Sequence, residues 1–204
     1  IVDTLFGDAN PGGKLPVTFP RSVGQVPIYY NHKNTGRPFA ASNKYTSKYL
    51  DIDNTPLYPF GYGLSYTKFR VDNLKLSKLE ILPTERLKVT AEVSNIGPVA
   101  GDEVVQLYIH DVAATVTRPV KELRGFKRLT LQQGETQTVE FTLGRKELEF
   151  LGRDLKPVLE TGEFQVYVGN SSDSGVQSSF SVVDRHSPPR ARTPVSNIPV
   201  EPPP

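Results

Sequence analysis

Apolar and polar positions alternate with a period of two along several short runs in the second half of the chain. In a β-strand this period places the apolar side chains on one face of a sheet and the polar ones on the other. Each run therefore predicts a strand with one buried face. The positions expected in the core are Leu87, Val89, Ala91, Val93, Leu107, Ile109, Phe141, Phe164 and Val166.

These runs recur at the spacing of a β-sandwich, with turn residues between them. About seven short strands in this arrangement are typical of an immunoglobulin-like or fibronectin type III sandwich. The chain has no Cys and no Trp, so it lacks the Cys…Trp…Cys core of antibody domains, which favours the fibronectin-like form. We predict an all-β fold with this domain over residues 69–184; another β-sandwich or a barrel stays open.

The first residues predict the end of a different domain. Ile1–Phe6 followed by Gly7 indicates the last turns of a helix with a glycine stop. Six residues do not sustain a helix alone, so the apolar side chains need partners. We expect residues 1–31 to be the remnant of a domain whose core lies upstream, with a floppy arm as the alternative. The chain starts with Ile and has no Met, so we expect a processed chain or a piece of a longer protein.

Residues 32–68 show neither a period of two nor one of 3.6, and predict a long irregular linker. Long loops in compact proteins are usually functional or disordered. The density of Tyr and Phe here argues for packing or ligand contact. We expect Tyr58, Phe60, Tyr62 and Tyr66 to pin the linker onto its neighbours. Residues 185–204, rich in Pro and Arg, predict a disordered tail.

Composition and motif searches exclude several classes of function. The net charge is only +2, which gives no footprint for nucleic acid. No apolar run approaches the roughly 20 residues of a membrane-spanning helix. None of the three histidines has a partner at metal-ligand spacing. We therefore expect no metal, no cofactor, no nucleic-acid partner and no membrane partner.

Four longer motifs, in the expected order, resemble the C-terminal part of glycoside hydrolase family 3. They are Leu5–Pro20, Pro56–Thr67, Glu103–Tyr108 and Arg118–Phe126. Two further motifs, Asn34–Pro38 and Lys44–Ser47, resemble the bacterial periplasmic β-glucosidase branch of that family. The resemblance covers residues 1 to about 183. It implies the close of an α/β-sandwich domain, a linker and a fibronectin type III-like domain.

The same resemblance implies a retaining, exo-acting β-glucosidase that removes terminal β-D-glucosyl residues. Retaining glycosidases need a nucleophile and an acid/base, two carboxylates about 5–5.5 Å apart. In this family both lie in domains before the segment that opens the chain, so we assign no catalytic residue here. The expected partners are those upstream domains and, through them, a β-glucoside or oligosaccharide; a homodimer stays open. The expected location is periplasmic or secreted.

Two alternatives stay open at this point. One is a β-xylosidase or another exo-glycosidase of the same family. The other belongs to a different class: a free-standing fibronectin-like module that acts as a spacer, interaction or binding domain.

Arg37 and Tyr45 are the candidate substrate-binding residues, on the aglycone side of the active site. Arg offers a fork of donors that suits adjacent sugar hydroxyls. Tyr offers a flat face for a pyranose ring and a hydroxyl group. Pro38 favours an extended conformation at Arg37. The matching motifs of the family lie near the sugar-binding cleft. The alternatives are that Arg37 pairs with an acidic residue of the upstream domain and that Tyr45 only packs.

Overall fold

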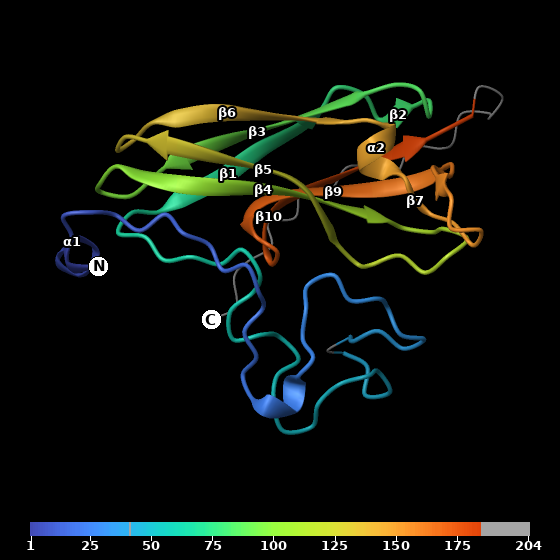
Figure 1. Cartoon of the computed structure of the whole chain (residues 1–204), viewed down its shortest axis with the longest axis horizontal. Coiled ribbons are helices and arrows are strands. Elements are labelled where there is room, and N and C mark those ends of the chain that lie inside the picture. Colours follow the sequence, from blue (N-terminus) through green and yellow to red (C-terminus); the bar gives the residue numbers. More distant parts are fainter. Residues whose placement is uncertain (41, 185–204) are drawn as a thin grey trace.

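The computed structural model describes residues 1–40 and 42–184, and its largest part is a β-sandwich (Figure 1). One sheet has the strand order β1-β3-β6, and the other has the order β2-β10-β9-β4-β5. A third, two-stranded sheet pairs β7 with β8. The predicted sandwich is confirmed. The tail predicted over residues 185–204 lies outside the described residues.

The elements follow one another along the chain with the irregular segment near the start. Between η1 and β1 the described residues form no regular helix or strand. The bounds are α1 Val2–Phe6, the 3-10 helix η1 Val23–Gln25, β1 Phe69–Leu76, β2 Glu80–Ile81, β3 Leu87–Asn95, β4 Gly101–Asp111, β5 Glu122–Leu131, β6 Thr136–Leu143, α2 Arg145–Leu148, β7 Phe150–Leu151, β8 Pro157–Val158, β9 Gly162–Ser171 and β10 Ser174–Val182.

The core lies between the two large sheets and is made by the alternating positions. In the antiparallel pair β3–β6, Ala91 faces Val139 and Val89 faces Phe141, so apolar side chains line one face of the sheet. All nine residues predicted for the core are buried, with Phe141 the most exposed of them at 8%. Burying one such side chain contributes about 1.5–3 kcal/mol.

Strand β4 departs from the simple alternation, because both of its faces are buried. Leu107 and Ile109 point into the core, yet Gln106 and Tyr108, which alternate with them, are only 3% and 1% exposed. The period of two predicts an outward, solvated face for these two residues. The irregular segment covers that face: Tyr30 packs edge-on against Tyr108, with ring centroids 5.5 Å apart.

Residues 15–19, which precede η1, pair through their backbone with residues 57–62 near the end of the irregular segment. Leu15 N donates to Tyr62 O over 2.8 Å, and Gly61 N donates to Leu15 O over 2.8 Å. Phe19 and Tyr58 form an isolated antiparallel bridge. The rings of Tyr58 and Tyr62 stack at 5.0 Å. Pro11, Pro16 and Pro20 lack the backbone N–H that a strand inside a sheet must donate. A short contact between two stretches of chain is compatible with them.

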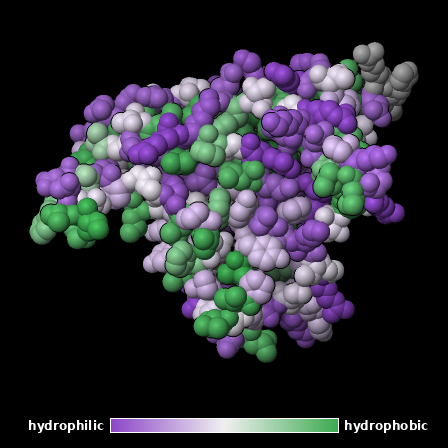
Figure 2. Space-filling model, viewed as in Figure 1, coloured by the Kyte–Doolittle hydropathy of each residue, from purple (hydrophilic) through white to green (hydrophobic). Residues whose placement is uncertain are grey.

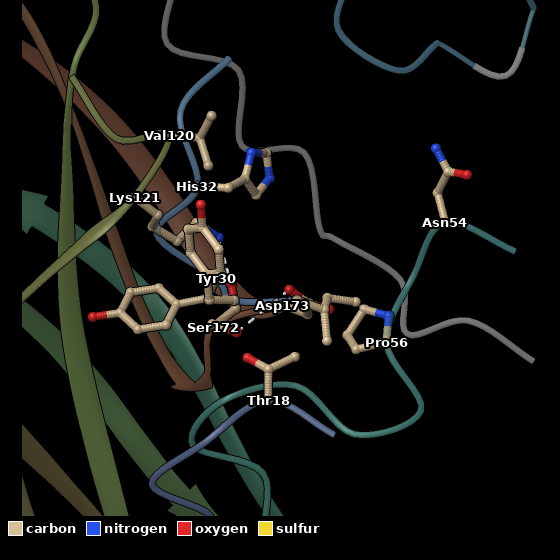
Figure 3. Close-up of a pocket in the computed structure, with 11 residues that line it drawn as sticks. Thr18, Tyr30, His32, Asn54, Pro56, Val120, Lys121, Ser172 and Asp173 are labelled. Atoms are coloured by element: carbon tan, nitrogen blue, oxygen red, sulfur yellow. Dashed lines mark hydrogen bonds between the residues drawn. The ribbon is translucent and has the colours of Figure 1, made fainter. Parts of the chain in front are cut away.

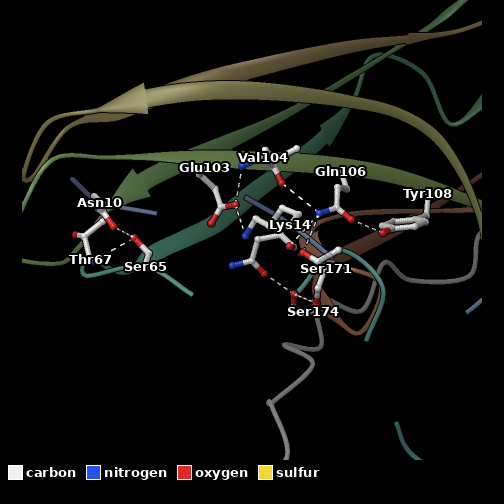
Figure 4. Close-up of polar contacts among 12 residues, drawn as sticks. Asn10, Lys14, Ser65, Thr67, Glu103, Val104, Gln106, Tyr108, Ser171 and Ser174 are labelled. Carbon is white, nitrogen blue, oxygen red and sulfur yellow. Dashed lines mark hydrogen bonds and ion pairs between the residues drawn. The ribbon is translucent and has the colours of Figure 1, made fainter. Parts of the chain in front are cut away.

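Polar contacts join this paired segment to the sandwich (Figure 4). Lys14 Nζ lies 2.6 Å from Glu103 Oε1, and the Glu103 side chain is only 4% exposed. Gln106 Nε2 donates to Gly61 O over 3.2 Å and to Asn170 O over 3.1 Å. The buried amide of Gln106 is therefore satisfied by the irregular segment and by the end of β9.

The N-terminal helix is present as expected and stands clear of the sandwich (Figure 1). Helix α1 ends at Gly7, whose φ of 89° is left-handed, a conformation that glycine adopts without strain. Figure 2 shows hydrophobic surface over α1 and over the segment that extends below the sandwich. Ile1 is 98% exposed and Phe6 81%. Within the described residues, none of the helices has the length and apolar character that crossing a bilayer takes.

Replacing Leu107 with Ala should lower the free energy of unfolding by about 2–5 kcal/mol, because it removes buried apolar contacts and leaves a cavity. The matched control is Lys88→Ala on the outward face of β3. Its ion pair with Glu140 is exposed, with an Nζ–Oε1 distance of 3.1 Å, so the control should change the free energy by less than about 1 kcal/mol. Urea unfolding measures both; equal effects would contradict the assigned faces.

Candidate functional site

The candidate residues Arg37 and Tyr45 lie on one loop, residues 33–54, which we call the projecting loop. It extends away from the sandwich (Figure 1). Both side chains are exposed, with Tyr45 at 68%. The Lys44 ammonium lies 5.0 Å from the centroid of the Tyr45 ring. Their assignment to a sugar site stays a prediction, and the exposure leaves both side chains accessible to a ligand.

Hydrogen bonds inside the projecting loop join its two arms. Ser47 N donates to Arg37 O over 3.0 Å, and Asn54 Nδ2 donates to Ser47 O over 3.3 Å. Tyr45 N donates to the side-chain oxygen of Asn43 over 2.9 Å. These contacts set the backbone on both sides of the two candidate side chains.

The first foot of the projecting loop rests on the connection between β4 and β5. Val120 N donates to His32 O over 2.9 Å, and Lys33 forms an isolated antiparallel bridge with Pro119. His110 Nδ1 lies 2.9 Å from Pro119 O, which ties this connection to β4. The period of two places His110 on the outward face of β4, yet this residue is partly buried.

The second foot is held by Gln25 of η1 and by Arg21, which precedes η1 by two residues. Gln25 is buried, and its Nε2 donates to Asp53 O over 2.8 Å. Arg21 Nε donates to Thr55 O over 3.0 Å. A buried amide with matched partners fixes the backbone that it contacts.

A cavity of about 190 Å³ lies between the two feet and the sandwich (Figure 3). His32 and Asn54 line it at the two feet, and Lys121, the residue before β5, lines it on the side of the sandwich. Its full lining is Thr18, Ile28, Tyr29, Tyr30, His32, Asn54, Pro56, Val120, Lys121, Ser172 and Asp173.

Lys121 is the most constrained charged residue of this cavity. Its Nζ donates to Ser172 O and lies 4.4 Å from the centroid of the Tyr167 ring and 5.9 Å from that of Tyr108. Burial lowers the pKa of Lys121, while the nearby Asp173 carboxylate acts in the opposite direction. Burial also favours the neutral form of Tyr108, and it therefore raises the pKa of this phenol.

Sequence reasoning missed Lys121, Tyr30 and Gln25. The expected role of Tyr58, Phe60, Tyr62 and Tyr66 fits the observed contacts: Phe60 stacks on Tyr30 at 4.5 Å, and the Tyr66 hydroxyl donates to Thr4 O. The aromatic density of residues 32–68 is the sequence signal that points to this packing.

A buried carboxylate lies at the end of β4. Asp111 is buried, and its Oδ2 has no hydrogen-bond partner among the described residues. Burial raises the pKa of Asp111, whereas the Arg118 charge and the Ala113 backbone N–H act in the opposite direction. Arg118 itself pairs with Glu122, with 2.6 Å between NH2 and Oε2. Across residues 1–40 and 42–184, no group of three or more His, Cys, Asp or Glu could hold a metal ion.

Comparison with known proteins adds the family. The glycosyl hydrolase family 3 C-terminal domain matches residues 1–66, and the fibronectin type III-like domain matches residues 103–172. The chain belongs to glycoside hydrolase family 3. The resemblance to the C-terminal part of this family is thereby confirmed. The family 3 match over residues 1–66 includes the projecting loop with Arg37 and Tyr45.

Relatives in this family share nearly the whole chain. A periplasmic β-glucosidase of Salmonella typhimurium is 48% identical over 90% of the chain and 24% of its own length. A β-xylosidase of Formosa agariphila is 49% identical over 84% of the chain and 23% of its own length. The β-glucosidase of Listeria innocua, solved in complex with glucose, superposes with a TM-score of 0.84 at 45% identity, over 88% of the chain and 25% of that structure. The chain spans about a quarter of the length of these relatives.

Replacing Asp111 with Asn should stabilise the protein at neutral pH, because the amide avoids the cost of a buried ionised carboxylate. Because the pKa of Asp111 is raised in the folded state, the folded protein binds the proton of this carboxyl group more tightly than the unfolded chain does. The free energy of unfolding of the parent chain therefore falls as the pH rises from about 4, the ordinary Asp value, through the raised folded pKa.

The stability gain of the Asp111→Asn variant should be full above the raised pKa and should vanish below about pH 4. Urea unfolding at a series of pH values from 3.5 to 8 measures the difference. A difference that stays constant with pH, or one that grows toward acid, would contradict the burial argument.

Proposed function

We propose that this chain serves a retaining β-glucosidase of family 3 and presents the projecting loop to the aglycone side of its active site. The observation that carries the proposal is the 48% and 45% identity to two β-glucosidases over about nine-tenths of the chain. By the same comparison we propose a periplasmic location, since the Salmonella relative is named a periplasmic enzyme.

The reaction needs a carboxylate nucleophile and a carboxylic acid/base on either side of the scissile bond. We propose that domains preceding Ile1 supply both groups, since the chain spans about a quarter of its relatives. The residues of this chain then contribute binding and orientation. Holding the sugar against the catalytic pair lowers the barrier by removing translational and rotational freedom before the reaction.

Arg37 and Tyr45 would make the contacts to the aglycone sugar. The exposed guanidinium of Arg37 can donate to two neighbouring hydroxyls at once, and it stays charged at every working pH. The exposed Tyr45 ring offers an apolar face to the pyranose. Because both residues lie on one loop that Ser47 holds together, they can contact one ligand.

A β-xylosidase is the second candidate, and the 49% identity to the Formosa enzyme favours it. The two activities differ in one hydroxymethyl group of the terminal sugar. Comparison of nitrophenyl β-glucoside with nitrophenyl β-xyloside, at equal enzyme concentration, decides between them.

A non-catalytic module is the third candidate, and it predicts no turnover of either substrate by the longest protein encoded in the same reading frame.

The purified 204-residue chain alone should hydrolyse no nitrophenyl β-glucoside, whereas the same chain with its upstream reading frame should hydrolyse it. It should also self-associate, because α1 exposes apolar side chains. Size-exclusion chromatography and a release assay measure these outcomes. Turnover by the chain alone, free of host enzyme, would overturn the division of labour.

In the active enzyme, Arg37→Ala and Tyr45→Ala should raise KM for a disaccharide about tenfold and leave the melting temperature unchanged. Loss of binding that is equal in the ground and transition states raises KM without lowering kcat. The matched controls are Lys48→Ala and Tyr49→Ala, exposed residues of the same type on the same loop. The assignment is wrong if the controls raise KM equally, or if Arg37→Ala and Tyr45→Ala keep the parent kinetics.

A further inference from the structure

We propose that Lys121, with Tyr30, is a positioning residue that sets where the projecting loop leaves the sandwich. Lys121 touches neither Arg37 nor Tyr45. It acts on them through the first foot of the loop, where Val120 N holds His32 O. The fibronectin-like domain would then be part of the binding device rather than a spacer.

The projecting loop depends on its feet for its position. Its internal hydrogen bonds join residues 35–47 and 54 to one another. Within the described residues, no hydrogen bond runs from residues 34–52 to the sandwich. The loop therefore moves as one body when a foot is released, and the two candidate side chains move with it.

Lys121 directly follows Val120, whose N–H binds the first foot of the loop at His32 O (Figure 3). Its ammonium donates to Ser172 O in the β9–β10 turn and lies over the Tyr167 ring at 4.4 Å. These contacts fix the Lys121 side chain against β9 and the turn that follows it. Since Lys121 follows Val120 directly, they also fix the direction of the Val120 N–H that receives the loop.

Tyr30 holds the same foot from the other side. Its ring stacks on Phe60 at 4.5 Å and meets the edge of Tyr108 at 5.5 Å. Tyr30 is two residues before His32, whose carbonyl is the acceptor at the foot. An ammonium beside aromatic rings in a partly desolvated site is a favourable and directional contact. Tyr30 therefore anchors residues 30–33 by packing on β4, and Lys121 anchors the Val120 N–H that binds the same stretch at His32 O.

Trypsin provides a direct readout on the chain itself, because it cleaves after Lys. Both lysines have exposed side chains, but the backbone of Lys33 pairs with Pro119 at the foot, whereas Lys44 lies in the part of the loop that makes no hydrogen bond to the sandwich within the described residues. Lys121→Met keeps the length of the side chain and removes the ammonium. We expect this variant to be cleaved after Lys33 about tenfold faster than the parent, since a charged hydrogen bond is lost, and to be cleaved after Lys44 at the parent rate.

Three further variants keep the test sharp. Tyr30→Leu lies outside the sandwich and should show the same selective cleavage even if Lys121→Met folds poorly. Lys121→Arg retains the charge and should restore the parent rate after Lys33. Lys127→Met is the matched control, because this lysine is exposed on β5, the strand that follows Lys121, with its Nζ 5.7 Å from the centroid of the Phe141 ring; it should change neither rate.

The proposal is overturned if cleavage after Lys33 stays at the parent rate in both Lys121→Met and Tyr30→Leu. It is also overturned if cleavage after Lys33 and Lys44 rises equally with a lower melting temperature, because that pattern is general unfolding. The consequence for saccharide binding rests on the proposed function: in the active enzyme, Lys121→Met should raise KM for a disaccharide and leave kcat unchanged. Selective cleavage with unchanged KM would count against the sugar site while leaving the positioning role in place.

Discussion

The burial of Gln106 and Tyr108 beneath the irregular segment is the contact on which the rest of the structure depends. A strand face with an amide and a phenol would normally meet water. Here the amide donates to Gly61 O, and the phenol donates to that same amide. Because buried polar groups without partners are costly, removing the segment would leave both groups unsatisfied. The sandwich and the irregular segment therefore stabilise each other.

This mutual burial also places the projecting loop. The segment contacts β4 through Gly61 and Tyr30, and η1 binds it through Gln25. These supply the two feet, and the feet carry the loop with Arg37 and Tyr45. A sandwich at the end of a chain needs only a short connection, so the long one here is consistent with a role in presenting side chains.

The sequence predicted the sandwich well because its physical basis is local. A period of two, turn residues and β-branched side chains act within each run, and the nine predicted core residues are all buried. The second face of β4 could not be predicted in this way. Gln106 and His110 carry a polar signal that normally indicates solvent. The contact with Gly61 buries Gln106, and the connection that carries Pro119 lies against His110, which is partly buried.

The candidate site was predictable to a smaller extent. Motif resemblance singled out Arg37 and Tyr45, and the structure leaves both exposed on one loop. Lys121 and Gln25 carry no signal of their own, since a single Lys or Gln is usually solvated. Their burial depends on Ser172 and Asp53, which lie 51 and 28 residues away along the chain. Contacts of this kind appear only once the chain is folded.

Amide hydrogen exchange of the irregular segment tests the central claim most directly. The N–H groups of Leu15 and Gly61 donate across the segment beneath which β4 is buried. If segment and sandwich form one cooperative unit, these two amides should exchange with an opening free energy close to that of the β4 core amides, such as Leu107. Exchange of Leu15 and Gly61 at the rate of an unprotected amide, while Leu107 stays protected, would contradict the account.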